Sequence, residues 1–215
     1  MESPARSASF VIGLDLGQAS DFTAIIVNQW TPVSLPGEFA DEPPHFSHWE
    51  HQFRHIQRFA LKTPYPTMVE QTGQLLAAVQ PKGRVRLIID HTGVGRPVVD
   101  MFRQARFGVP IHAITITAGQ NAKRDEHHPA DWTVPKKDLV GALQAQFHQG
   151  RIGIARGLPG ADVLTKELTS FRMKLTTSAN LTFEAWRDGD HDDLVLAAGL
   201  AVWGAERFGN PGGLI

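Results

Sequence analysis

The chain has 215 residues and carries 21 Lys and Arg against 22 Asp and Glu, so its formal net charge is −1. This length and a hydrophobic fraction of 42% are typical of one globular domain with a buried core, and they exclude a disordered or fibrous chain. The absence of cysteine excludes disulfides, thiolate zinc sites and cysteine nucleophiles, which leaves carboxylates and the 10 His as candidate metal ligands.

The apolar runs and the charge balance disfavour two further classes of protein. No apolar run approaches the roughly 20 residues of a membrane span, and residues 1–9 lack the basic-then-apolar order of a signal peptide. We therefore expect a cytoplasmic protein with no membrane partner. The balanced charge argues against a domain that coats nucleic acid through bulk electrostatics, but it leaves room for a local binding groove.

The balanced charge is an average over unlike segments. Residues 1–50 hold one base and seven acids, and the tail from residue 188 holds one base and five acids. The bases lie in the middle of the chain, with nine against three acids in 51–110 and ten against seven in 111–187. This pattern is expected if the two ends of the chain meet around something that needs negative charge, or if the charged runs are simply solvated loops.

The first third of the chain predicts three strands. An apolar run at residues 10–15 ends in an acid, and a run rich in β-branched residues covers 22–27, so we expect two strands joined as a hairpin. The stretch 31–44, rich in Pro, Glu and Asp, is expected to be a loop that leads to a third strand near 56–61. Pro66 opens a predicted helix with apolar residues on one face.

The remainder of the chain predicts alternating strands and helices. A strand at 85–90 also ends in an acid, and it is followed by a helix through Val98 and Phe102. The later predicted elements are a strand at 111–117, a polar mobile loop at 118–133, a helix at 135–148, a short strand at 151–155, a helix at 161–171, a hairpin at 173–186 and a last helix from 191. This order predicts an α/β class with a mixed sheet.

Acids stand at the ends of three predicted elements. Asp15 ends the first strand, Asp90 ends a central strand, and Asp192 and Asp193 open the last helix. A carboxylate at the end of a buried strand is costly to desolvate unless a positive charge compensates it, and a metal ion is the strongest compensator. Each position alone is more often a turn or cap residue, but the three together favour a catalytic carboxylate cluster.

Carboxylate ligands without cysteine favour Mg²⁺ or Mn²⁺, and a pair of such ions is the arrangement used for phosphoryl transfer. In that hypothesis one ion activates the attacking water and the other stabilises the leaving oxygen. We expect Asp15 to bridge both ions and Asp90 to complete one side of the site. Adjacent helical residues diverge by about 100°, so only one of Asp192 and Asp193 is expected to be a direct ligand.

Several other polar residues have two interpretations. Lys136 and Lys137 are candidate contacts to a DNA backbone, or else part of a solvated first helical turn. Arg96, close to two glycines, is a second candidate for a phosphate contact. We interpret His191 as a flanking residue of no consequence, although a ligand or a proton shuttle is the alternative, and Asp21 as a turn-former.

Four motifs lie along the chain. They are Ile12-Gly-Leu-Asp-Leu-Gly with Asp21-Phe-Thr-Ala, Ile89-Asp-His-Thr-Gly-Val-Gly-Arg-Pro-Val-Val-Asp100, Val134-Pro-Lys-Lys-Asp-Leu-Val140, and His191-Asp-Asp-Leu-Val-Leu-Ala-Ala. In type and order these motifs resemble those of the nuclease domain of phage terminase large subunits. The resemblance extends from about residue 10 to residue 208.

The resemblance implies an RNase H-like fold, which is a mixed β-sheet flanked by α-helices. It also implies a metal-dependent endonuclease that cuts concatemeric double-stranded viral DNA during genome packaging in the host cell cytoplasm. The catalytic and metal-binding carboxylates then fall on Asp15, Asp90 and the pair Asp192 and Asp193. The implied partners are the DNA, the terminase ATPase domain, the portal and the small terminase subunit.

Two features depart from the family pattern. Large subunits join an ATPase motor to this nuclease, but no Gly-x-x-x-x-Gly-Lys-[Ser/Thr] loop occurs in this sequence. We therefore expect a single nuclease domain over residues 1–215, with its core at 9–208, from an excised domain or a truncated prophage gene. His91 follows the second acid, where the family pattern has a small residue, so the surroundings of the metal are expected to differ.

Other functions fit parts of the sequence. The first motif also resembles the first phosphate loop of actin-like ATPases and sugar kinases, although 215 residues are too few for the two domains of those enzymes. A domain that has lost catalysis and only docks on the portal or small subunit is a second alternative, and a Holliday-junction resolvase is a third. For the nuclease hypothesis we expect weak, salt-sensitive and sequence-independent DNA binding by this chain alone.

Overall fold

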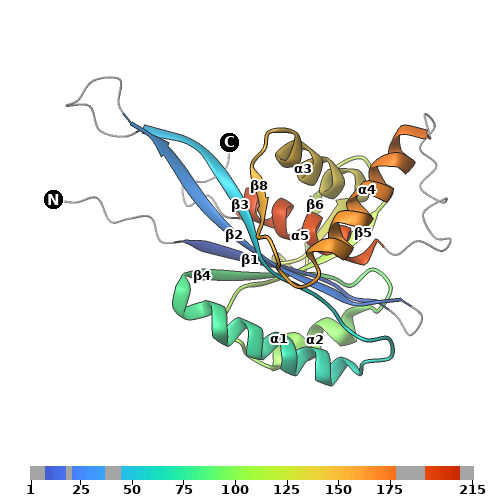
Figure 1. The fold of residues 1–215 in the computed structure, drawn as a ribbon. Helices are drawn as coiled ribbons and strands as arrows, with labels where there is room; N and C mark the ends of the chain where they lie inside the picture. The colour runs from blue at the N-terminus through green and yellow to red at the C-terminus, as the bar shows by residue number, and fades with distance from the viewer. Residues whose placement is uncertain (1–7, 18–20, 37–44, 178–191, 209–215) are drawn as a thin grey trace.

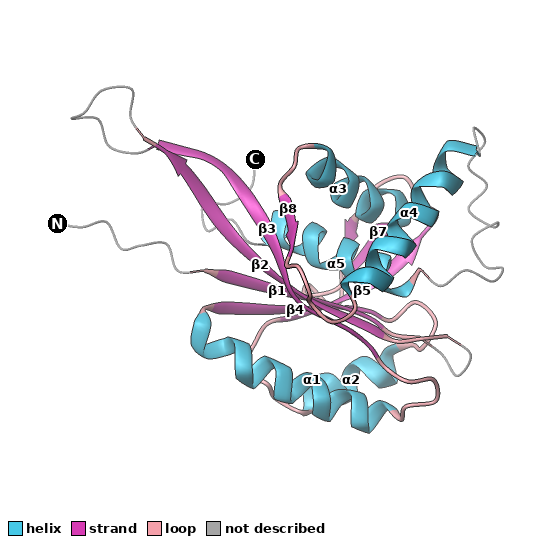
Figure 2. Cartoon of the chain, in the orientation of Figure 1, coloured by secondary structure: helices cyan, strands magenta, loops and turns pink. Residues whose placement is uncertain are grey.

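The computed structural model describes residues 8–17, 21–36, 45–177 and 192–208 (Figure 1). In these ranges the strands form one eight-stranded mixed sheet in the order β6-β7-β5-β4-β1-β2-β3-β8 (Figure 2). An antiparallel meander comes first, and three strands parallel to β1 follow it. The strands are β1 (Ser9–Asp15), β2 (Ala24–Leu35), β3 (His45–Arg58), β4 (Arg84–Asp90), β5 (Ile111–Thr117), β6 (Lys123–Arg124), β7 (Trp132–Pro135) and β8 (Ile152–Ile154).

Helices cover both faces of this sheet (Figure 1). Helices α1 (Tyr65–Val79) and α2 (Arg96–Gln104) pack on one face, and the 3-10 helix η1 (Gln80–Lys82) follows α1. Helices α3 (Lys136–His148), α4 (Ala161–Thr177) and α5 (Asp193–Phe208) lie on the other face. The three-layer arrangement confirms the α/β class with a mixed sheet that the sequence predicts.

Alternation along the central strands decides which side chains meet which helices. Ile12 packs in the cluster that contains α1 and α2, whereas Val11 of β1 and Ile88 of β4 pack in the cluster that contains α5. Successive side chains of a strand point to opposite faces of the sheet. Asp15 and Asp90, at the ends of the same two strands, therefore belong to the face that α5 covers.

Helix α5 approaches β1 until the two backbones touch. A Cβ atom on Gly13 would lie 2.0 Å from the carbonyl oxygen of Ala197 and 2.8 Å from the amide nitrogen of Ala201. Further along the helix, a Cβ atom on Gly204 would lie 3.1 Å from Val11, so α5 runs antiparallel to β1. The first turn of α5 is thereby directed toward the end of β1, where Asp15 stands.

The structure corrects the expectations for the second and third strands. Strand β2 continues to Leu35, within the region 31–44 that was expected to be a loop, and residues 37–44 lie outside the described ranges. Strand β3 covers His45–Arg58, so it begins well before the strand expected near 56–61. The two strands pair from Ala24 to Leu35 of β2, and this cross-strand pairing outweighs the poor strand propensity of a Pro-containing sequence.

The second half of the chain follows the predicted order with three differences. Segment 118–133, expected to be a loop, contains β6 and the start of β7, which pair with each other. Helix α4 continues to Thr177, so the hairpin expected at 173–186 is helical in its first residues, and the rest of it lies outside the described ranges. The last helix begins at Asp193, two residues later than expected.

Among the described helices, none combines the length and the apolar character that a bilayer span requires.

The contact between β1 and α5 predicts a large effect of adding one methyl group. Gly13→Ala should lower the free energy of unfolding by about 2 to 3 kcal/mol, because the new Cβ atom overlaps the backbone of α5 and forces the helix away from the sheet. Urea unfolding followed by circular dichroism measures this change.

Gly141→Ala is the matched control for this experiment. Gly141 lies in helix α3, and no atom would come within 4 Å of a Cβ atom added there. This variant should be neutral or more stable by about 0.5 to 1 kcal/mol, because alanine favours a helix over glycine. Equal effects of the two substitutions would contradict the backbone contact between β1 and α5.

Candidate active site

Asp15 and Asp90 are neighbours at the ends of adjacent parallel strands. Strands β1 and β4 pair in register so that Asp15 lies directly beside Asp90, about 4.8 Å away across the sheet. Each residue is only 7% exposed. The sheet therefore places the carboxylates of two sequence motifs, which are separated by more than 70 residues in the chain, next to each other in a buried position.

The pKa of Asp15 is raised well above its ordinary value. Burial is the largest cause, and the negative charges of Asp90, Asp193 and Asp192 follow in that order, while Lys136 opposes them. Burial also raises the pKa of Asp90, although hydrogen bonds from Thr92 lower it. The four acids selected from the sequence thus interact as one cluster.

Asp90 is held in place by the loop that follows β4. Its Oδ1 accepts hydrogen bonds from the Thr92 backbone amide at 2.8 Å and from the Thr92 hydroxyl. The hydroxyl oxygen of Thr92 in turn accepts from the amide of Ile116 in β5 at 2.7 Å. His91, the residue that departs from the family pattern, lies with its Nε2 3.2 Å from the hydroxyl of Thr115 and so contacts β5.

Asp192 and Asp193, at the start of α5, face different cations. Lys136 Nζ lies 3.0 Å from Asp192 Oδ2, and an Arg58 guanidinium nitrogen lies 3.2 Å from Asp193 Oδ2. Asp193 is only 8% exposed. The side chains of these adjacent helical residues therefore diverge toward different cations.

Glu167 and Arg58 are site residues that sequence analysis missed. Arg58, at the end of β3, forms an ion pair with Glu167 of α4 as well as with Asp193. The Oε2 atom of Glu167 accepts a hydrogen bond from the amide of Leu194 at 3.1 Å, so it caps the first turn of α5 from a neighbouring helix. Burial, followed by the charge of Asp193, raises the pKa of Glu167 to about 7 against the opposing effect of Arg58.

No local signal in the sequence identifies this pair. Glu167 lies inside a helical pattern, and Arg58 lies at the end of a strand whose limits were predicted wrongly. The two residues are 109 positions apart in the chain. Only the packing of α4 and α5 on the sheet brings them together with Asp193.

The residues predicted to contact DNA have different surroundings. Lys136 is bound within the carboxylate cluster through Asp192 rather than being solvated. Lys137 is exposed and donates to Gln120 Oε1 at 2.7 Å. Arg96, at the start of α2, lies 3.0 Å from a His128 ring nitrogen and 3.5 Å from an Asp125 oxygen. Residue 191, the flanking His, lies outside the described ranges.

The acids fit a divalent cation by their chemistry. Their oxygens are the hard ligands that Mg²⁺ and Mn²⁺ prefer, and burial, followed by the charges of the neighbouring acids, raises the pKa of Asp15. Among the described residues, however, no group of three or more His, Asp or Glu side chains forms a ready metal site. The acids that begin α5 contact protein cations instead, Asp192 through Lys136 and Asp193 through Arg58.

Comparison with known proteins identifies the fold. No protein-family model matches this sequence, and no curated protein matches it. A manganese-soaked structure of the human cytomegalovirus terminase nuclease domain matches with a TM-score of 0.54 and 12% identity, over 94% of this chain and 86% of that one. The chain has the RNase H-like fold of a terminase nuclease domain. The fold predicted from the four motifs is therefore confirmed.

Two further solved structures match at lower scores. The large terminase nuclease of the thermophilic phage G20c, with bound zinc, gives a TM-score of 0.49 and 16% identity, over 90% of this chain and 80% of that one. RuvC of Thermus thermophilus gives a TM-score of 0.38 and 12% identity, over 91% of this chain and 92% of that one.

The pKa shifts in the cluster predict that stability falls as pH rises. Glu167 has a pKa of about 7 when folded against an ordinary value of 4.5, so between these values the folded chain keeps a proton that the unfolded chain releases. Rising pH then favours unfolding, and Asp15 and Asp90 act in the same direction. Unfolding in a chelating buffer at several pH values between 4.5 and 7 should show this decline.

Glu167→Gln isolates the contribution of one group to this decline. The slope of unfolding free energy against pH should become shallower by up to about 1.4 kcal/mol per pH unit, the limit for a single proton. Glu126→Gln, at an exposed position, is the matched control. A slope that is the same in Glu167→Gln and in the unsubstituted chain would show that Glu167 does not take up a proton on folding.

Proposed function

We propose that this chain is a divalent-metal-dependent endodeoxyribonuclease of a viral genome-packaging terminase, encoded by a bacteriophage or prophage. Its substrate is concatemeric double-stranded DNA, and its reaction is phosphodiester hydrolysis. The observation that carries the proposal is the pairing of Asp15 with Asp90 at the ends of β1 and β4, beneath the acids that begin α5. This arrangement occurs in a fold that the chain shares with a terminase nuclease domain.

Asp15, Asp90 and Asp193 are the residues that would hold two Mg²⁺ or Mn²⁺ ions, because Asp15 lies beside Asp90 and within the influence of the charge of Asp193. When bound, such ions supply an activated water and offset the charge that develops on the leaving oxygen. The protein contributes the positions of the ligands. Thr92 fixes the carboxylate of Asp90, and the Glu167 cap fixes the first turn of α5.

Asp193, rather than Asp192, is proposed as the direct ligand of the pair. Asp193 is the more deeply buried of the two, and its charge raises the pKa of Asp15 more than the charge of Asp192 does. Lys136 offsets the charge of Asp192 at 3.0 Å. Lys137 and Arg96 remain candidate contacts to the DNA backbone, and we propose that they make binding weak, salt-sensitive and independent of sequence.

We propose the partners of this nuclease from its resemblance to terminase large subunits. They are the terminase ATPase domain, the portal and the small terminase subunit, in the cytoplasm of the host cell.

The fold favours a nuclease over the alternatives of a kinase fragment or a docking domain without catalysis. Calorimetric titration with ATP and Mg²⁺ distinguishes the kinase fragment, and a comparison of branched with linear DNA distinguishes a Holliday-junction resolvase.

The proposal predicts a strong effect of a single carboxylate substitution. Asp15→Asn should lower the rate of plasmid cleavage with Mn²⁺ by roughly a thousandfold, because the loss of a shared ligand removes several kcal/mol of transition-state stabilisation. Gel analysis of plasmid nicking over time measures this rate. Asp21→Asn, an exposed acid near the same strand, is the matched control and should cleave as the unsubstituted chain does.

Two results of this assay would overturn the nuclease proposal. One is no cleavage at any protein concentration with either Mg²⁺ or Mn²⁺, which would favour the docking domain without catalysis. The other is cleavage that persists unchanged in Asp15→Asn, which would indicate a contaminating nuclease.

The two acids of α5 should differ in their effect on cleavage. Asp193→Asn should lower the rate by roughly a thousandfold, as Asp15→Asn does, whereas Asp192→Asn should lower it by about 10-fold to 100-fold, the range for residues that support a metal ligand. Both variants are compared in the plasmid assay after their folding has been checked by circular dichroism. The reverse order of effects would make Asp192 the ligand.

A further inference from the structure

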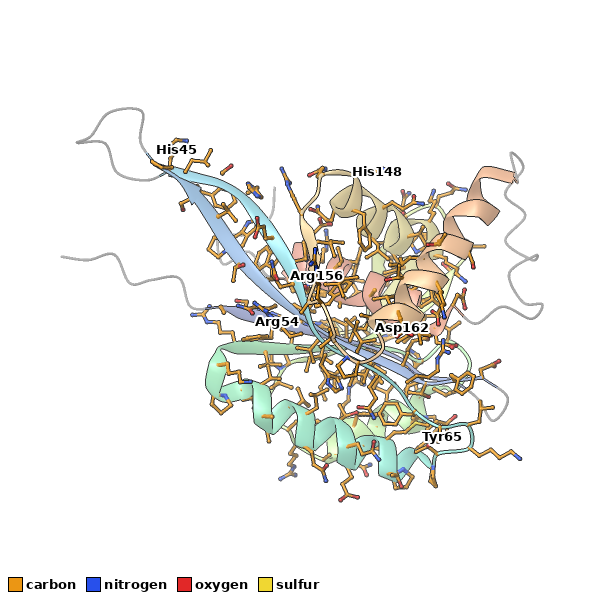
Figure 3. The ribbon with its side chains drawn as sticks, in the orientation of Figure 1. His45, Arg54, Tyr65, His148, Arg156 and Asp162 are labelled. Carbon is orange, nitrogen blue, oxygen red and sulfur yellow. The ribbon has the colours of Figure 1, made fainter. Side chains whose placement is uncertain are left out.

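A two-stranded arm extends from the sheet beyond its neighbours (Figure 1). We define the arm as residues 30–35 of β2 and 45–50 of β3. Figure 3 shows His45 at its far end and Arg54 where it joins the body of the molecule. Strand β8 pairs with β3 only at residues 51–53, so in the described part of the chain the arm half of β3 has β2 on one side and no strand on the other.

An arm of this kind requires a partner for two physical reasons. A strand edge presents unpaired backbone N–H and C=O groups, which form a template for another strand. A two-stranded ribbon is also only marginally stable in water unless something packs on it. The arm keeps two large apolar side chains exposed, Leu35 at 47% and Phe46 at 49%.

A cavity of about 280 Å³ lies where the arm meets α3 and α5. Its lining includes Trp30, Phe46, Trp49, Gln146, Arg151 and Glu206. Trp30 pairs with Ser9 at the start of β1, whereas Asp15 stands at the end of that strand. Seven strand residues span roughly 20 Å, so this cavity is separate from the carboxylate cluster.

An aromatic wall lines the cavity. The rings of Trp30 and Trp49 stack with centroids 3.6 Å apart, and the ring centroid of Phe46 lies 5.4 Å from that of Trp49. A wall of this kind suits the apolar side chain of a ligand.

Charge decides between a polypeptide and a nucleic acid as the occupant. In the sequence, residues 31–50 contain four acids and no Lys or Arg, and three of these acids lie in 37–44, outside the described ranges. Among the described residues that line the cavity, Arg151 is the single Lys or Arg. A phosphate backbone would be repelled by such a segment, whereas basic side chains of a polypeptide would be attracted.

We infer that the arm and its cavity bind an extended segment of a partner protein. The segment adds as a strand to the free edge of β3 and places an apolar side chain against Phe46 and Trp49, with Lys or Arg at neighbouring positions. This inference does not depend on nuclease activity, because it concerns the opposite end of β1 from Asp15.

A library of random linear peptides displayed on phage provides the test. Peptides enriched on the full chain are synthesised, and their dissociation constants are measured by fluorescence anisotropy. We expect one apolar anchor flanked by basic residues, and a loss of affinity of about tenfold or more in Phe46→Ser. Leu35→Ser is the matched control, since it removes an equally exposed apolar side chain from the arm but not from the cavity, and it should change affinity less than about twofold.

Two further measurements make the test independent of any single variant. Methylation of alternate backbone nitrogens of the peptide should abolish binding, because strand addition uses those N–H groups. Trp49→Ala should weaken binding as Phe46→Ser does. Peptides that bind both variants normally, or that tolerate backbone methylation, would overturn the inference.

The same variants distinguish two other occupants of the arm, a nucleic acid and a second copy of this chain. Binding of a fluorescent single-stranded oligonucleotide that is lost in Phe46→Ser would overturn the inference in favour of a nucleic acid. Self-association in sedimentation velocity that is lost in Phe46→Ser and retained in Leu35→Ser would overturn it in favour of a second copy of this chain. A failed peptide selection accompanied by normal DNA cleavage would remove this inference and leave the proposed nuclease standing.

Discussion

The contact between the backbones of β1 and α5 is the constraint on which the rest of the structure depends. Gly13 leaves no side chain between the strand and the helix, so the carbonyl of Ala197 can approach the sheet directly. Because α5 runs antiparallel to β1, this contact fixes the helix start near the strand end. The acids from the two ends of the chain meet there, as their distribution in the sequence suggested. A larger residue at position 13 would push α5 away from β1. The acids that begin α5 would then lie farther from Asp15.

The assembled cluster is electrostatically unfavourable for the protein alone. Burial and mutual repulsion raise the pKa of Asp15, and the chain opposes this with Lys136 beside Asp192 and Arg58 beside Asp193. Glu167 adds another carboxylate to the same region while it caps α5. A site built in this way loses stability as its carboxylates ionise, and it gains stability from any cation that binds the folded state. The same concentration of charge that weakens the fold is what a divalent metal requires.

The two ends of β1 have different characters. At one end lie buried carboxylates, with Lys and Arg near them. At the other end lie an aromatic wall and, in the described part of the chain, an edge of β3 with no strand beside it. This division separates a surface suited to phosphate chemistry from one suited to a polypeptide.

The sequence by itself determined the central strands, the α/β class and the acids Asp15, Asp90, Asp192 and Asp193. Continuous apolar runs that end in a carboxylate are local signals, and they place β1 and β4 correctly because both strands are buried on both faces. Only the tertiary structure decided the arm, the extent of α4 and the roles of Arg58 and Glu167. The arm is half-exposed and contains proline, so its strands depend on pairing with each other rather than on propensity. Arg58 and Glu167 come from elements far apart in the chain, and no periodicity within either element encodes their meeting.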